Sequence, residues 1–181
     1  GPAELGKALA LKAETLSMQH KTAEAIPLFG EALKADPGNS FTKARLAAAW
    51  VSLHDNAKAL PYFKEATEAA PESLEYAEAY LSALIALGKM EDALKVVASS
   101  NARFPANARL TYLKARVDDA LDRSKEAEAA YLRAAAADAS LVEPHLYLAR
   151  LYVRFRRLAE AKPQLEEALK KAPDNAEVRV V

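Results

Sequence analysis

The stretch that decides the fold is AIPLFGEALKADPGN at residues 25–39, which returns in altered form as ALPYFKEATEAAPES at residues 59–73. The two stretches share an alanine, an aromatic residue, a second alanine and a proline at matching places, 34 residues apart. Internal repetition with a period of this length is typical of helical repeat proteins. The same places can be followed along the rest of the chain.

Four columns of matching residues run through the chain at this period. A small residue, a large apolar residue and a second small residue recur at offsets of four and three, and a proline follows five residues later. The columns are Ala25, Ala59, Ala93, Ala127 and Ala161; Phe29, Phe63, Val97, Tyr131 and Leu165; Ala32, Ala66, Ser100, Ala134 and Ala168; and Pro37, Pro71, Pro105, Ala139 and Pro173. This register predicts five repeats, at 6–39, 40–73, 74–107, 108–141 and 142–175.

Each repeat is predicted to contain two antiparallel helices. Offsets of four and three place the columns on one face of a helix, and alanine lets a neighbouring helix approach closely. The proline ends that helix because it disfavours helical geometry in the residue before it. An earlier helix in each repeat has its own columns, Leu16, Trp50, Leu84 and Tyr152, and Ala13, Ala47, Ala115 and Ala149. Asn39 and Asn175 follow the turns as plausible helix caps.

With these residues, the chain resembles the tetratricopeptide repeat family over residues 6–175. The resemblance implies an all-α fold of the α–α superhelix class, in which antiparallel helix pairs stack with a right-handed twist and the first helices line a concave groove. Three residues depart from the family pattern: Lys12 and Asp118 stand where leucine or an aromatic residue is usual, and Ser100 replaces alanine. We therefore expect looser or locally shifted packing in the fourth repeat.

Composition narrows the classes of function. Lysine plus arginine and aspartate plus glutamate balance at 25 each, which argues against nucleic-acid binding driven by phosphate attraction. Cysteine is absent, so the sequence offers no disulfide, thiolate metal site or thiol nucleophile, and both cytoplasm and periplasm remain open. No apolar run is long enough to predict a membrane span.

The ends of the chain suggest a piece of a longer protein. Residues 1–5 are interpreted as a tag scar, Gly1-Pro2, followed by an N-terminal lead-in. Residues 176–181 stand in phase with the start of a sixth repeat, so they are either a truncated helix or a short native tail.

Residues that could carry chemistry are few. His20 and His54 occupy equivalent turns, where histidine tolerates a left-handed backbone, and we interpret them as turn residues and not as a metal pair. His145 has no second histidine or carboxylate cluster at ligand spacing, and no glycine-rich phosphate loop exists. The sequence therefore predicts no catalytic residue, no cofactor and no metal, and the protein is not expected to be an enzyme.

The family's groove is lined by first-helix positions outside the packing columns. In the fourth and fifth repeats these positions carry arginine and tyrosine: Arg109, Tyr112, Arg116, Tyr147, Arg150 and Arg154, with Arg156 and Arg157 in the following turn. Guanidinium groups bind carboxylates through paired hydrogen bonds, so these residues predict a site for an acidic or carboxylate-ended peptide. The alternative is that these arginines are solvated or locally ion-paired.

Some members of the family hold chaperone tails with a lysine–asparagine–asparagine–lysine–arginine set. The corresponding positions here are Ala10, Glu14, Arg45, Glu75 and Ala79, so docking of that kind is not expected.

The function that the sequence favours is a non-catalytic scaffold or adaptor that binds a protein or peptide partner. The alanine-rich repeats suggest a bacterial protein, in envelope biogenesis, secretion or polysaccharide export. The alternative is a regulatory repeat segment of a larger enzyme or transport protein. The oligomeric state is left open.

Overall fold

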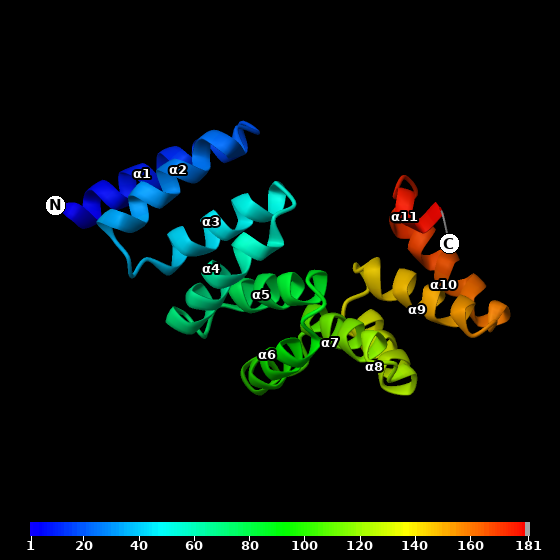
Figure 1. Cartoon of the computed structure of the whole chain (residues 1–181). Coiled ribbons are helices and arrows are strands. Elements are labelled where there is room, and N and C mark those ends of the chain that lie inside the picture. The colour runs from blue at the N-terminus through cyan, green and yellow to red at the C-terminus, as the bar shows by residue number, and fades with distance from the viewer. Residues whose placement is uncertain (180–181) are drawn as a thin grey trace. The chain divides into compact units, whose positions relative to one another are not determined.

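The computed structural model describes residues 1–179, which form helices joined by short turns (Figure 1). The chain divides into two compact units, Gly1–Lys89 and Met90–Val181. Val180 and Val181 lie outside the described residues, so the prediction for 176–181 can be compared only with the residues before them. Those residues include the short helix α11 (Ala176–Arg179), whose Val178 is buried.

The first unit contains two helix pairs and a fifth helix. The pairs are α1 (Pro2–Met18) with α2 (Thr22–Ala35) and α3 (Ser40–Ser52) with α4 (Asn56–Ala69), and α5 (Leu74–Ala86) packs on α4. In Figure 1 the two helices of the first pair lie side by side. Helix α1 begins at Pro2, so the residues predicted as a lead-in belong to the first helix.

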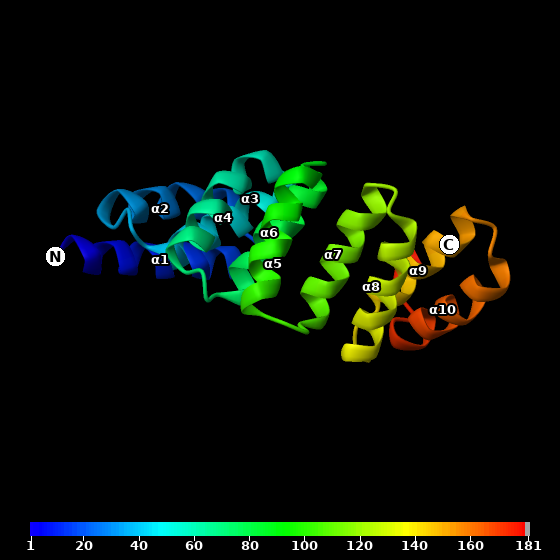
Figure 2. The ribbon, with the colours of Figure 1, turned by 90° about the horizontal axis from the view of Figure 1, so that it is seen from below.

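The second unit begins with α6 (Met90–Arg103) and continues with two pairs. These are α7 (Ala108–Ala120) with α8 (Ser124–Ala137), seen beside each other in Figure 2, and α9 (Glu143–Arg154) with α10 (Leu158–Lys171). Helices α5 and α6 both fall in the range 74–107, so the division between the units lies inside the third predicted repeat. The single array over 6–175 therefore stays a prediction.

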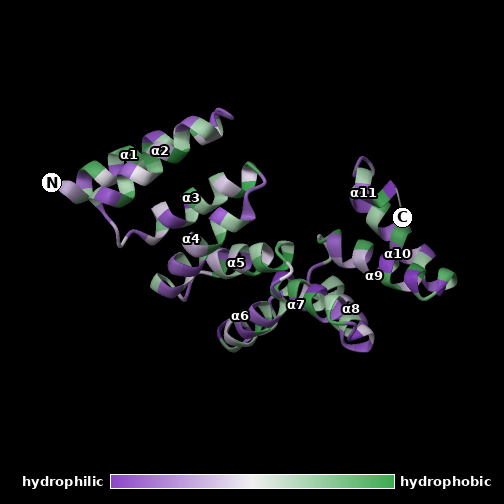
Figure 3. Ribbon diagram, in the orientation of Figure 1, coloured by the Kyte–Doolittle hydropathy of each residue, from purple (hydrophilic) through white to green (hydrophobic). Residues whose placement is uncertain are grey.

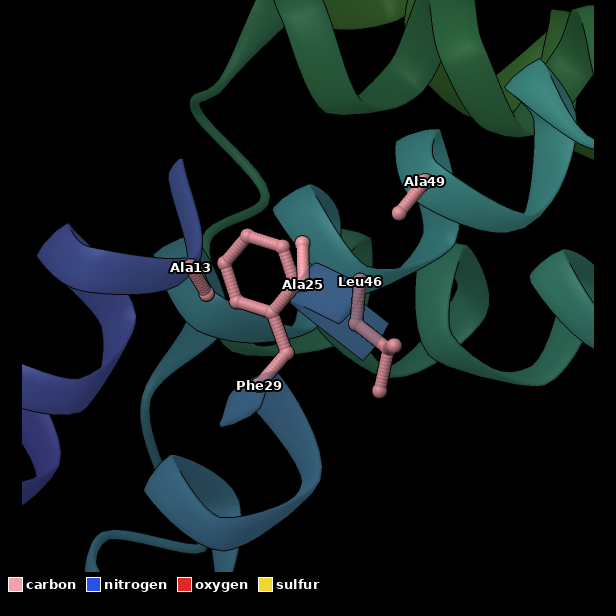
Figure 4. Packing of buried hydrophobic residues seen from close by; sticks show 5 residues of the cluster. All are labelled: Ala13, Ala25, Phe29, Leu46 and Ala49. Carbon is pink, nitrogen blue, oxygen red and sulfur yellow. The ribbon is translucent and has the colours of Figure 1, made fainter. Parts of the chain in front are cut away.

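The helices pack through the alanine columns. Hydrophobic and hydrophilic residues alternate around the helices of both units (Figure 3). Ala25, Ala59, Ala93 and Ala127 are each fully buried at 0% exposure. In the first unit the ring of Phe29 lies among Ala13 of α1, Ala25 of α2 and Leu46 and Ala49 of α3 (Figure 4). An alanine at these places brings the helices close enough for one aromatic ring to fill the space between them.

The turns inside the helix pairs confirm the interpretation of the histidines. His20, His54, Gly88, Asp122 and Arg156 recur at the 34-residue period, and all have a left-handed backbone with φ between 57° and 69°. The residue type varies from histidine to arginine, so the turn geometry is set by the helix pair and is tolerated by each side chain.

The caps between repeats follow the register as well. Asn39 caps α3, its side chain accepting a hydrogen bond from the backbone N–H of Thr42 at 2.9 Å, and Asn107 caps α7 through Leu110 at 2.9 Å. The Asn175 side chain accepts from the backbone N–H of Glu177 at 2.9 Å, as expected of a cap for the next segment.

The looser packing expected of the fourth repeat is not observed, while a local shift of the repeat stays a prediction. Helix α7 buries six side chains and α8 four, including Ala130, Tyr131 and Ala134 at 0% exposure. The unusual Asp118 is accommodated because it is buried with partners: Lys114, one turn earlier, contacts one carboxylate oxygen, and Arg123 lies 3.7 Å from the other. An ion pair thus replaces the apolar contact without opening the repeat.

Candidate binding site

The six predicted site residues lie on two helices of the second unit. Arg109, Tyr112 and Arg116 belong to α7, and Tyr147, Arg150 and Arg154 belong to α9. Spacings of three and four residues keep each set along one side of its helix. These six residues are called the arginine–tyrosine patch below.

A cluster of three tyrosines forms the base of the patch. The ring of Tyr147 lies 5.7 Å from that of Tyr112 and 6.3 Å, nearly parallel, from that of Tyr131 in α8. The rings of Tyr112 and Tyr131 are also 6.3 Å apart. These separations lie in the range of favourable aromatic contacts, so one ring from each of three helices fixes the distance between α7 and α9.

Two guanidinium groups lie over the ring of Tyr147. Arg116 is centred 4.1 Å from the ring and Arg150 5.1 Å from it, one from α7 and one from α9. Arg116 also donates a hydrogen bond to the hydroxyl of Tyr112 at 3.1 Å. A ring with negative charge on its faces offsets part of the repulsion between the two cations and orients both groups.

Arg116 has no carboxylate partner among the described residues, whereas the other three arginines of the patch do. Arg109 lies 3.9 Å from Glu143, Arg150 lies 3.4 Å from Glu177, and Arg154 contacts Asp119 directly. These side chains are 37% to 51% exposed, and exposed ion pairs contribute about 0–1 kcal/mol each. An incoming carboxylate could therefore exchange for Glu143 or Glu177 at little cost.

Tyr112, one of the six predicted site residues, does not offer contact surface to a partner. It is only 6% exposed, because its ring packs against the other two tyrosines beneath Arg116. Burial raises the pKa of Tyr112 to about 12, and its hydrogen bond from Arg116 opposes that rise. The phenol is therefore neutral at physiological pH and serves to hold Arg116 in place.

Sequence reasoning missed Tyr131 as part of the site, because its column identified it only as a packing residue. It is fully buried, and its hydroxyl has no hydrogen-bond partner in the described part of the protein. Burial raises the pKa of Tyr131 above its ordinary value, so this phenol also stays neutral. The signal available in the sequence was the presence of tyrosine where the other repeats carry phenylalanine, valine or leucine.

The arginines in the turn after α9 behave differently from the patch. Arg157 binds both oxygens of Glu128 at 2.6 and 2.9 Å, contacts Glu160 and lies 4.4 Å from the ring of Tyr152. Arg156 makes no ion pair or hydrogen bond with any described residue and occupies the left-handed turn position. In the first unit, Arg45 lies between Glu14 at 3.2 Å and Glu75 at 3.6 Å.

Histidine and acidic side chains do not assemble into a metal site over residues 1–179. No group of three or more histidine, cysteine, aspartate or glutamate side chains could hold a metal ion there. His145 instead contacts the side chain of Gln164 at 2.9 Å. Within the same residues, no helix has the length and apolar character needed to cross a membrane.

Comparison with known proteins gives the class. Tetratricopeptide repeat families match residues 16–84 and 51–117, and again 142–181. The chain therefore belongs to the tetratricopeptide repeat family, whose members act as protein-interaction scaffolds and are generally not catalytic. No curated protein matches the sequence significantly.

Solved structures share the fold. MamA from Desulfovibrio magneticus RS-1, residues 41 to the end, has 17% identity and a TM-score of 0.81, with 97% of this chain and 99% of that chain covered. TTC0263, a thermophilic repeat protein of Thermus thermophilus, has 26% identity and a TM-score of 0.77 over 97% and 95% of the two chains. PilW, a widely conserved type IV pilus biogenesis factor, has 20% identity and a TM-score of 0.80 over 94% and 79%. The predicted all-α class of antiparallel helix pairs is confirmed.

Proposed function

We propose that this protein is a non-catalytic scaffold whose arginine–tyrosine patch binds an acidic segment of a partner protein. The observation that carries the proposal is Arg116, a guanidinium fixed over Tyr147 and against Tyr112 with no carboxylate of its own among the described residues. Because Arg116 is already held in one orientation, less conformational entropy is lost when a partner binds.

The neighbouring arginines extend the site along α9. Arg150 shares the ring of Tyr147 with Arg116, and its pair with Glu177 is long, at 3.4 Å, and exposed. A partner carboxylate between the two guanidinium groups would accept hydrogen bonds from both, which is stronger than a contact to one. Arg109 and Arg154, at the two ends of the patch, would then meet further acidic residues of the same segment.

The test is selection of a displayed random-peptide library on the whole chain, followed by fluorescence anisotropy on the peptides recovered. Peptides that bind the patch should be rich in aspartate and glutamate, and Arg116→Gln or Arg150→Gln should each weaken them about tenfold. Their affinity should also fall as salt is raised, because the contacts are exposed charges.

The matched control is Arg133→Gln, which removes an exposed arginine from α8 without touching the patch. Acidic peptides that bind Arg116→Gln, Arg133→Gln and the unaltered chain equally well would refute the patch as their site. Circular dichroism of each variant would show that the exchange leaves the helices intact.

For the biological setting, we propose assembly of the bacterial cell envelope. Support comes from the alanine-rich repeats and from the fold shared with PilW, described as a pilus biogenesis factor. Crosslinking in living bacteria from a photoreactive residue at position 177, an exposed position beside Arg150 but outside the patch, would test this. Capture of envelope-assembly proteins would support the setting, and capture of only cytoplasmic enzymes would refute it.

A further inference from the structure

The turn between α9 and α10 exposes apolar side chains that the folded chain does not use. Val153 is 38% exposed, Phe155 51% and Leu158 63%, and all three fall within the sequence VRFRRL at residues 153–158. Large apolar residues scattered singly over a surface are normal, but several together with basic residues indicate an interaction site.

A cleft of about 220 Å³ lies beside this turn. It is lined by Ser124, Lys125, Glu128, Leu151, Phe155 and Arg157, so one wall comes from α8 and the other from the end of α9 and its turn. A space of this size is smaller than pockets for drug-sized ligands and suits one apolar side chain of a larger partner.

Two cationic side chains near the cleft have no ion-pair partner among the described residues. Neither Lys125 nor Arg156 forms an ion pair or hydrogen bond with any residue from 1 to 179, and both are exposed. Arg157, by contrast, is neutralised by Glu128 and Glu160. The unpaired positive charge at this end of the unit therefore comes from Lys125, which lines the cleft in the first turn of α8, and from Arg156, which follows Phe155 in the α9–α10 turn.

Arg156 is also placed where arginine is unfavourable for folding. Its φ is 57°, a backbone conformation that glycine adopts without strain, and glycine occupies the equivalent place at Gly88. The side chain forms no ion pair or hydrogen bond with a described residue that would offset the strain. The same backbone conformation recurs in the other helix-pair turns, so the conformation belongs to the repeat, while the arginine side chain at this place is specific to the α9–α10 turn.

We propose that the α9–α10 turn is a second docking surface, which borders the arginine–tyrosine patch where Arg154 lies 5.2 Å from the ring of Phe155. It would bind a protein segment that inserts one apolar side chain beside Phe155 and places carboxylates on Lys125 and Arg156. A partner protein fits better than an anionic membrane. The cleft is concave, so a segment that projects one apolar side chain can enter it, whereas a flat lipid surface cannot.

The experiment uses peptides recovered from the same displayed library on the whole chain and measures each by fluorescence anisotropy. One class of peptides, combining an apolar residue with acidic ones, should bind Phe155→Ser and Arg156→Gly about tenfold more weakly than the unaltered chain. Arg156→Gly relieves backbone strain and should raise the midpoint of thermal unfolding, so weaker binding cannot reflect damage to the fold.

The matched control is Asp122→Gly, another replacement by glycine at φ 57°, which removes an acidic side chain and should not weaken this class of peptides. Arg116→Gln should also leave the class unaffected, which separates this surface from the patch. The proposal is overturned if no recovered peptide depends on both Phe155 and Arg156. It is likewise overturned if the two variants reduce binding only to phosphatidylserine vesicles.

Discussion

Replacing the buried Asp118 by leucine should stabilise the second unit. Asp118 is 2% exposed and stands in a column that other repeats fill with large apolar residues, Leu16, Trp50, Leu84 and Tyr152. Its side chain is held by Lys114 and Arg123, whose own side chains are 31% and 49% exposed. The carboxylate is thus removed from water, whereas the two cations that pair with it remain partly hydrated.

The magnitude follows from what each residue gains and loses. A buried leucine side chain contributes about 1.5–3 kcal/mol relative to an exposed one. Loss of the ion pairs costs about 1 kcal/mol, because Lys114 and Arg123 are left hydrated and not buried without a partner. We expect Asp118→Leu to raise the free energy of unfolding by about 1 kcal/mol. Asp118→Asn, which keeps the size but removes the charge, should lower it by about 1–2 kcal/mol.

The assay is urea unfolding followed by the helical circular dichroism signal, together with hydrogen exchange of the amides of α7. The two variants should move the unfolding midpoint in opposite directions with an unchanged slope. If Asp118→Leu destabilises the protein as much as Asp118→Asn does, the ion pair contributes more than its exposed partners suggest and the reasoning is refuted.

Four further exchanges, one of them followed through a pH series, test other parts of the structure. Ala93→Leu should lower the free energy of unfolding by about 1–3 kcal/mol, because this alanine is fully buried; chemical denaturation measures it. His54→Gly, at φ 60°, should raise the free energy of unfolding by about 1 kcal/mol, and an unchanged thermal midpoint would contradict that. Tyr131→Phe removes a buried hydroxyl without a partner among the described residues and should be neutral or stabilising, which calorimetry can decide. The hydrogen bond from Arg157 lowers the pKa of Glu128 in the folded state. The stabilisation from this hydrogen bond is therefore present at neutral pH and is lost as the pH falls through the lowered pKa. Glu128→Gln should flatten that part of a curve of thermal midpoint against pH.

Much of the fold was predictable because it rests on local geometry. The spacing of Ala25, Phe29 and Ala32 places three residues on one helical face whatever the neighbours are, and all three are buried in the structure. The same period placed His20 and His54 in left-handed turns. The looser packing predicted for the fourth repeat is not found, because the repeat pattern marks Asp118 as an unusual residue but does not reveal that Lys114 and Arg123 pair with it.

The candidate site was only partly predictable. The sequence placed six arginines and tyrosines on first helices, and the structure brings Arg116, Tyr147 and Arg150 together. In the structure Tyr112 is buried and not on the surface. Tyr131 of α8 joins the site, although its place in a packing column had indicated only a core residue.

By itself, then, the sequence determined the helix pairs, their turns and the small residues that let the helices meet, because these follow from backbone sterics and a period repeated along the chain. Only the tertiary structure decided which charges are neutralised. Asp119, Glu143 and Glu177 lie 35, 34 and 27 residues from the arginines that they contact, and ion pairing depends on a few ångströms between neighbouring helices. A repeat period does not set such distances. In the patch Arg116, and in the turn after α9 Arg156, are the arginines that have no carboxylate partner among the described residues.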